Sequence, residues 1–198
     1  IAGKAVASTP RVIDIDAGAR HWAFRPLAHV KVPGEQGGNP IDAFIDERLR
    51  AAGLARSASS SPHVLIRRMT FDLTGLPPTP EEVDTFVGDA QSDESGAIRR
   101  LIDRLLASPH YGEKWGRHWL DVARYADSNG LDENIALGTA WRYRDYVVNA
   151  FNDDLPFGEF ITEQLAGDLL ESKDVPTRQR RMAATAFLNL GAKVLAEP

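Results

Sequence analysis

Apolar residues recur three and four positions apart over most of the chain after residue 39, as in Ile98, Leu101, Ile102, Leu105 and Leu106. This spacing places the apolar side chains on one face of an α-helix. The same spacing is found at residues 41–52, 65–73, 83–87, 139–151, 157–170 and 177–190. Strand-like alternation is nearly absent from this region. The pattern predicts an all-α body, an irregular bundle of about eight helices joined by short turns.

Four of the predicted helices begin with a polar residue followed by proline. These pairs are Asn39-Pro40, Ser61-Pro62, Thr79-Pro80 and Ser108-Pro109. A side-chain oxygen before a helix accepts a hydrogen bond from a free backbone N–H group, and proline suits the first helical position. Thr79 is followed three residues later by Glu82, which predicts a capping box.

The first 38 residues lack this helical spacing, which predicts an extended N-terminal arm. Residues 12–16 alternate apolar and acidic side chains, which is typical of a short edge strand, and residues 33–38 read as a flexible connector. We therefore expect an arm and connector at 1–38 and a helical domain at 39–198. Because the chain begins with Ile1, we also expect it to be a processed or cut-out segment.

Composition narrows the classes of function. The 198 residues include 43% hydrophobic ones and carry a formal net charge of -5, so we expect a globular protein that does not bind nucleic acid. No apolar run approaches the roughly 18 residues needed to span a bilayer, so no membrane span is predicted. The sequence has no Cys, which excludes disulfides, thiolate metal sites and covalently attached c-type haem within this chain. No known metal-ligand spacing is present, and we predict no metal site.

The stretch with the most unusual composition is YGEKWGRHWLDVARYADSNG at 111–130. In a helix continuing from Pro109, one stripe would carry Tyr111, Trp115, His118, Asp121, Val122 and Tyr125. Aromatic rings, an imidazole and a carboxylate on one face favour a polar network inside the bundle or a pocket wall. His118 and Asp121 could touch, and the carboxylate would then fix the imidazole tautomer for acid–base chemistry, metal binding or haem ligation. The alternative is a core histidine whose hydrogen bonds are satisfied by Asp121.

Two further polar groups follow. Arg124, Asp127, Ser128 and Asn129 could line a pocket for sugar hydroxyls or an anion, or they could simply cap a helix before Gly130. The side chains of Trp141, Arg144 and Asp145 share a face. They could form the lip of the same pocket, or a helix start docked by the Trp ring with a local ion pair.

Several motifs resemble a large family of secreted planctomycete proteins, the cytochrome-associated domain of unknown function. They are NPID at 39–42, LIRRMTFDLTGLPPTP at 65–80, HWLDVARYAD at 118–127, WRYRDY at 141–146 and QLAGD at 164–168. The resemblance implies an extracytoplasmic location and a larger protein with a cytochrome-c-like domain and a C-terminal domain of unknown function. In many members a Cys-x-x-Cys-His motif follows shortly after the position of Pro198. The resemblance therefore implies a domain truncated before a haem-attachment segment, with c-type haem only in the full-length protein.

Three hypotheses follow, and whether the chain is an enzyme stays open. The first is a helical module beside c-type haem, serving electron transfer or polysaccharide processing, with the face of His118, Asp121 and Tyr125 near the haem. The second is a glycan-acting enzyme with His118, Asp121 and Asp127 as catalytic candidates. The third is a non-catalytic carbohydrate-binding or scaffold module. The expected partners are the remainder of the polypeptide and polysaccharide. The ligand-pocket candidates are Trp115, Arg124, Tyr125, Asn129, Trp141, Arg144 and Asp145.

Overall fold

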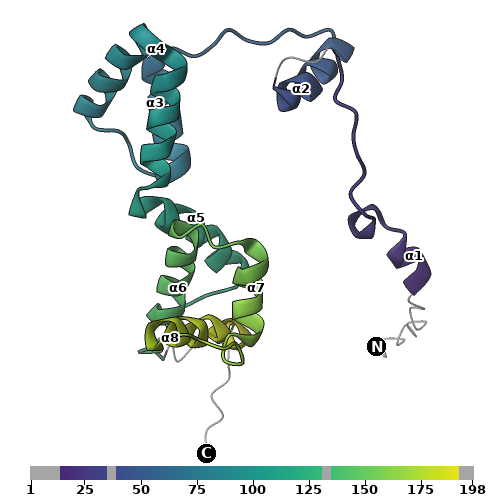
Figure 1. The fold of residues 1–198 in the computed structure, drawn as a ribbon, viewed down its shortest axis with the longest axis vertical. Helices are drawn as coiled ribbons and strands as arrows, with labels where there is room; N and C mark the ends of the chain where they lie inside the picture. Colours follow the sequence, from purple (N-terminus) through teal and green to yellow (C-terminus); the bar gives the residue numbers. More distant parts are fainter. Residues whose placement is uncertain (1–13, 35–38, 131–134, 192–198) are drawn as a thin grey trace, which may run out of the picture. The chain divides into compact units, whose positions relative to one another are not determined.

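The structure is a computed structural model that describes residues 14–34, 39–130 and 135–191 (Figure 1). These ranges contain eight α-helices and two short 3-10 helices, with no strand beyond an isolated bridge between Ser128 and Ala136. The all-α prediction is confirmed. Contacts between residues divide the chain into two compact units, Ile1–Ala58 and Ser59–Pro198, which are described separately.

The first unit contains helices α1 (Ile15–Ala19) and α2 (Pro40–Ala51) and the 3-10 helix η1 (Trp22–Phe24). The prediction of an extended arm is therefore wrong within 15–24. The carboxylate of Asp14 accepts a 2.8 Å hydrogen bond from the Ala17 N–H group, and this local cap favours a helical turn over a strand. Residues 1–13, which include the start of the expected strand, lie outside the described residues.

Helix α2 begins as predicted, because Asn39 Oδ1 accepts a 3.0 Å hydrogen bond from the Ile41 N–H group. None of its residues is buried. The predicted start of the helical domain at residue 39 lies within the first unit, and it stays a prediction.

The second unit opens with α3 (Pro62–Thr74) and α4 (Pro80–Leu106). The predicted capping box is confirmed: Thr79 Oγ1 accepts from the Glu82 N–H group, and Glu82 Oε2 accepts from the Thr79 N–H group. The sequence suggested two helices within the range of α4, and the structure agrees, because the backbone of Asp93 is not helical and divides α4 into two helical halves. Asp93 Oδ1 accepts a 2.9 Å hydrogen bond from the Gly96 N–H group and so caps the second half. The α3–α4 core is built from Ile66, Phe86, Ala97, Leu101 and Leu105.

Helix α5 (Pro109–Val122) packs mainly against α6 (Trp141–Asn152) and α3. Two buried glycines of α5 face α6. A Cβ atom on Gly112 would lie 2.3 Å from the Val148 carbonyl oxygen, so only glycine fits there. The Gly112 N–H group also donates a 2.7 Å hydrogen bond to Asn152 Oδ1. A Cβ atom on Gly116 would make an ordinary 3.4 Å contact with the Val147 side chain.

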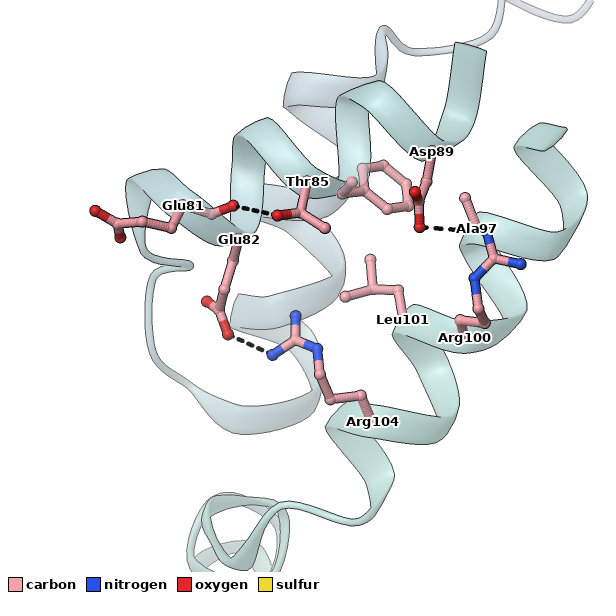
Figure 2. A pocket seen from close by; sticks show the side chains of 9 residues that line it. Glu81, Glu82, Thr85, Asp89, Ala97, Arg100, Leu101 and Arg104 are labelled. Atoms are coloured by element: carbon pink, nitrogen blue, oxygen red, sulfur yellow. Dashed lines mark hydrogen bonds and ion pairs between the residues drawn. The ribbon is translucent and has the colours of Figure 1, made fainter. Parts of the chain in front are cut away.

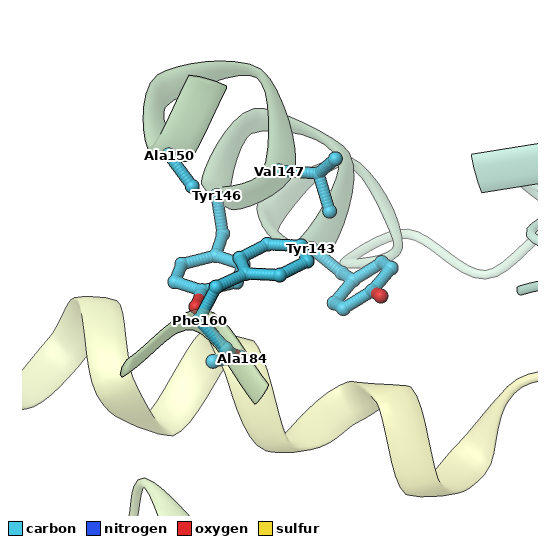
Figure 3. Close-up of a cluster of buried hydrophobic side chains, with 6 residues drawn as sticks. All are labelled: Tyr143, Tyr146, Val147, Ala150, Phe160 and Ala184. Carbon is cyan, nitrogen blue, oxygen red and sulfur yellow. Dashed lines mark hydrogen bonds between the residues drawn. The ribbon is translucent and has the colours of Figure 1, made fainter. Parts of the chain in front are cut away.

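The unit is completed by α7 (Phe157–Ala166), α8 (Val175–Ala184) and the 3-10 helix η2 (Thr185–Asn189). α7 is thus shorter than the helix expected at 157–170, and the helix expected at 177–190 is α8 continued by η2. The buried core of this region is Tyr143, Tyr146, Val147, Ala150, Phe160 and Ala184 (Figure 3). The rings of Tyr146 and Phe160 stack in parallel with centroids 5.8 Å apart.

Polar side chains inside this aromatic core have partners. Gln164 Oε1 accepts from the Tyr143 hydroxyl at 2.6 Å and from Trp119 Nε1 at 3.0 Å. Glu163 is almost fully buried and forms ion pairs with Arg180 at 2.8 Å and with Arg181 at 3.1 Å. These bonds join α5, α6, α7 and α8, and they fix the direction in which each helix presents its remaining side chains.

Gly112→Ala and Gly116→Ala form a matched pair that tests the close approach of α5 and α6. We expect Gly112→Ala to lower the free energy of unfolding by about 1–3 kcal/mol, because the added methyl group meets backbone atoms of α6. Gly116→Ala should be neutral or stabilising by up to about 1 kcal/mol, because alanine favours the helix and the methyl group has room. Urea denaturation measures both changes. Equal changes in the free energy of unfolding would contradict the closer approach of α6 at Gly112 than at Gly116.

The pH dependence of stability tests the buried polar network. Burial raises the pKa of Tyr143 to about 12, against 10.0 for an exposed tyrosine. The neutral phenol is favoured in the folded state, so its contribution to stability is complete below pH 10.0 and is lost as the pH rises towards 12. Urea denaturation from about pH 9 to about pH 12 should show a falling free energy of unfolding, with a shallower fall in Tyr143→Phe. If the free energy of unfolding of Tyr143→Phe fell with pH as steeply as that of the wild type, the raised pKa of Tyr143 would be contradicted.

Candidate functional site

One side of α5 carries Tyr111, Trp115, His118 and Val122, which we call the aromatic flank of α5. It lies roughly a quarter turn around the helix from Gly112 and Gly116, at about 100° per residue. Trp115 is 37% exposed and Val122 is 78% exposed. The glycines make the contact with α6, so the bulky residues of the flank stay accessible at the surface of the unit.

His118 and Asp121 are both exposed, so the prediction that they face the interior is wrong. The predicted contact between them is also not observed among the described residues. The carboxylate of Asp121 lies 4.0 Å from Arg117 Nε, one turn earlier, and the imidazole of His118 lies against the Trp115 ring with centroids 5.4 Å apart. The physical reason is that Gly112, Gly116 and Trp119 face α6, which leaves His118 and Asp121 on the exposed side of α5.

The stripe expected along 111–125 is interrupted because α5 ends at Val122. Arg124 adopts a left-handed conformation, with φ of 60°. The Tyr125 N–H group then donates a 2.9 Å hydrogen bond to the Leu120 carbonyl oxygen, which is the 6→1 bond of a Schellman turn. Tyr125 therefore leaves the flank and stacks on Tyr143, with centroids 6.1 Å apart.

Three of the ligand-pocket candidates and one catalytic candidate, Asp127, come together beyond this turn. The Tyr125 hydroxyl donates to the carboxylate of Asp127, and Arg144 forms a 3.0 Å ion pair with Asp145. Burial raises the pKa of Tyr125, as does its hydrogen bond to Asp127. The hydrogen bond to Asp145 raises the pKa of Arg144. The charges of Arg144 and Asp145 also act on the Tyr125 phenol, so the four groups form one cluster.

A cavity of about 160 Å³ lies beside the same turn. Asn129 is almost fully buried, and its Oδ1 atom accepts a 3.1 Å hydrogen bond from the Ile135 N–H group, which ties the two sides of the loop together. Residues along the cavity wall include Arg124, Ala126, Ser128, Gly130, Leu137 and Leu190. The spacing around Arg124 pointed to a pocket here, but Leu137 and Leu190 were missed because they reach it only through the tertiary fold.

Trp141 does not dock the start of α6 into the core. Its ring is 47% exposed, and the Arg142 guanidinium carbon lies 5.5 Å from the ring centroid in a cation–π contact. The expectation of a docked Trp141 is therefore wrong, because Tyr143 and Tyr146 occupy the buried side of this helix. Trp141 is also not among the residues that line the cavity beside Arg124.

A separate groove of about 370 Å³ lies between the two halves of α4 (Figure 2). Its walls carry opposite charges. Glu82 pairs with Arg104, and Asp89 pairs with Arg100 at 3.3 Å, so each ion pair spans the groove. These exposed pairs contribute little stability individually and occupy the charges that a ligand would need.

The three catalytic candidates do not converge on a shared position. His118 contacts Trp115, Asp121 pairs with Arg117, and Asp127 accepts from Tyr125. Their catalytic roles stay predictions. In the part of the chain that the structure describes, no group of three or more His, Asp or Glu side chains could hold a metal ion. None of the described helices combines the length and the apolar character needed to cross a membrane.

The comparison with protein families gives a match over most of the chain. The family described as PSCyt2, protein of unknown function (DUF1549), matches residues 40–197. The chain belongs to this family. Neither the curated proteins nor the solved structures include a match. Membership agrees with the domain of unknown function that the motifs resemble, and the family description assigns no activity.

The backbone at Arg124 gives a direct test of the helix end. Glycine adopts φ of about 60° without steric strain, so we expect Arg124→Gly to raise the free energy of unfolding by about 0.5–1 kcal/mol. Asp154, with φ of 49°, ends α6 in the same way and provides the matched control. Asp154→Gly should raise the free energy of unfolding by a smaller amount, because aspartate tolerates this conformation better than arginine.

Urea denaturation of the two variants measures the comparison. If Arg124→Gly lowered the free energy of unfolding by more than about 1 kcal/mol, the arginine side chain would be stabilising the fold, contrary to this account.

Proposed function

We propose that the chain is a non-catalytic helical interaction module of a larger extracytoplasmic protein, in which the aromatic flank of α5 docks a cytochrome-c-like domain of the same polypeptide. The observation that carries the proposal is the exposure of Trp115 and Val122 on a helix whose contacts with α6 are made by other residues. The extracytoplasmic location and the identity of the neighbouring domain rest on the resemblance of the sequence motifs.

The chemistry of the flank suits a protein partner. Aromatic residues are enriched in the centres of protein interfaces, where charged residues are depleted. The flank offers an indole, a phenol ring, an imidazole and a branched aliphatic side chain. Arg117 and Asp121, exposed on the neighbouring positions of α5, could provide the polar rim.

The ring geometry favours a protein partner over a flat sugar-stacking platform. The rings of Tyr111 and Trp115 are inclined by 41°, and those of Trp115 and His118 by 53°. A sugar ring stacks best where aromatic faces lie parallel, whereas a protein surface adapts to tilted rings. The glycan-acting enzyme is not favoured either, because its candidate acid–base groups have separate neighbours.

The proposal assigns the haem-binding groups to the neighbouring domain. The sequence has no Cys for covalent attachment, and His118 is not among the residues that line the groove of α4 or the cavity beside Arg124. The chain would therefore contribute a docking surface, while the haem-binding groups would belong to the neighbouring domain.

Hydroxyl-radical footprinting tests the proposal. The extent of side-chain oxidation is compared by mass spectrometry between this chain alone and the longer natural polypeptide. We expect oxidation of Trp115, His118 and Val122 to fall several-fold in the longer protein. Trp141 and Phe157, which are 47% and 70% exposed, provide internal controls that should change little.

Two outcomes would contradict the proposal. One is equal oxidation of the flank in the two proteins. The other is protection of the flank by added polysaccharide but not by the neighbouring domain, which would favour the carbohydrate-binding alternative. Trp115→Ala in the longer polypeptide should restore oxidation of His118 and Val122 if the indole anchors the interface.

A further inference from the structure

We propose that the cavity beside Arg124 is a binding site for a carboxylate group, with the Arg124 guanidinium as its recognition element. This site lies beyond the end of α5 and is distinct from the aromatic flank, so it is independent of the proposed docking function. The inference depends on three features: the residue type at a left-handed position, the pairing of the cationic side chains, and the size and lining of the cavity.

The first feature is that arginine occupies a backbone position suited to glycine. After α5 the chain takes the left-handed turn of a Schellman motif, with φ of 60° at Arg124. Glycine is the usual residue there, and a side chain with a Cβ atom is disfavoured by roughly 1 kcal/mol. The turn itself does not need the guanidinium, because its hydrogen bonds are made by backbone atoms. A function of the side chain itself would explain the choice of residue.

The second feature is the pairing of charges. Arg144 is paired with Asp145, and Arg180 and Arg181 with Glu163. Asp121, three residues before Arg124, lies 4.0 Å from Arg117, and Asp127, three residues after it, accepts the Tyr125 hydroxyl. Within residues 14–34, 39–130 and 135–191, Arg124 has no hydrogen bond or ion pair through its guanidinium. Its charge is therefore not neutralised by an acidic partner, and Arg124 is one of the residues that line the cavity.

The third feature is the cavity. Its volume is about 160 Å³, less than half that of the groove in α4. Ala126, Leu137 and Leu190 give it apolar walls, while Ser128 and Asn189 add polar side chains. A single guanidinium beside apolar and neutral polar side chains suits a monoanion with a short carbon body, since a planar carboxylate accepts two parallel hydrogen bonds from arginine.

Two sources could supply such a group. One is a small free carboxylic acid, and the other is a uronic acid residue of an acidic polysaccharide. Both present the same carboxylate to Arg124, and they differ in whether a sugar ring must also be accommodated at the mouth of the cavity.

Backbone-amide NMR titration of the intact chain tests the site, with sodium acetate and sodium D-galacturonate as separate probes. We expect saturable shifts at Ser128, Gly130 and Leu137 with at least one probe. D-Galactose, which has the same ring without the carboxylate, and sodium sulfate should each cause at least tenfold weaker responses. Stronger binding of acetate would identify a small acid as the ligand, and stronger binding of galacturonate would identify a uronic acid residue.

The variants locate the interaction. Arg124→Gly keeps the left-handed turn and should weaken binding by tenfold or more. Asp154→Gly, at the matching turn of α6, and Arg117→Gln, on the exposed surface of α5, should leave binding unchanged. The proposal would be overturned by no saturable shift with either carboxylate, by an equal response to galactose or sulfate, or by unchanged binding in Arg124→Gly.

Discussion

The contact between α5 and α6 at Gly112 determines how the second unit presents its surfaces. A Cβ atom at this position would lie 2.3 Å from a backbone oxygen of α6, so the two helices can approach this closely only at a glycine. The Gly112 N–H group is bound by Asn152, which fixes the position of α5 along α6. Because this contact is made by a residue without a side chain, the aromatic flank of α5 lies to one side of it.

As a result, α5 and the turn that follows it form two different surfaces. Within α5, Trp119 turns towards the core, where its indole N–H group bonds to Gln164 and Tyr143, while Trp115 and His118 remain at the surface. After Val122, the left-handed turn at Arg124 redirects the chain and brings Tyr125 onto Tyr143. The flank and the cavity beside Arg124 are therefore separate surfaces, although their residues are close in sequence.

Local signals in the sequence predicted the helices well. Caps and proline positions act within a few residues, and the predicted starts at Pro40, Pro62, Pro80 and Pro109 are all observed. The orientation of α5 was not predicted, because ranking faces by hydrophobicity gives glycine no weight as a packing residue. The helix end at Arg124 was also missed, since arginine carries no signal for a left-handed turn. The cavity walls at Leu137 and Leu190 depend on contacts between distant segments, which local patterns do not encode.

The central claim is that α5 buries its glycines and Trp119 while the indole of Trp115 faces solvent. The most direct test is the rate at which each indole N–H proton exchanges with water, measured by NMR and assigned with single Trp→Phe variants. The account predicts slow exchange for Trp119, whose N–H group is hydrogen-bonded at 2.9 Å and 3.0 Å, and much faster exchange for Trp115. Protection of Trp115 equal to that of Trp119 in the isolated chain would contradict it.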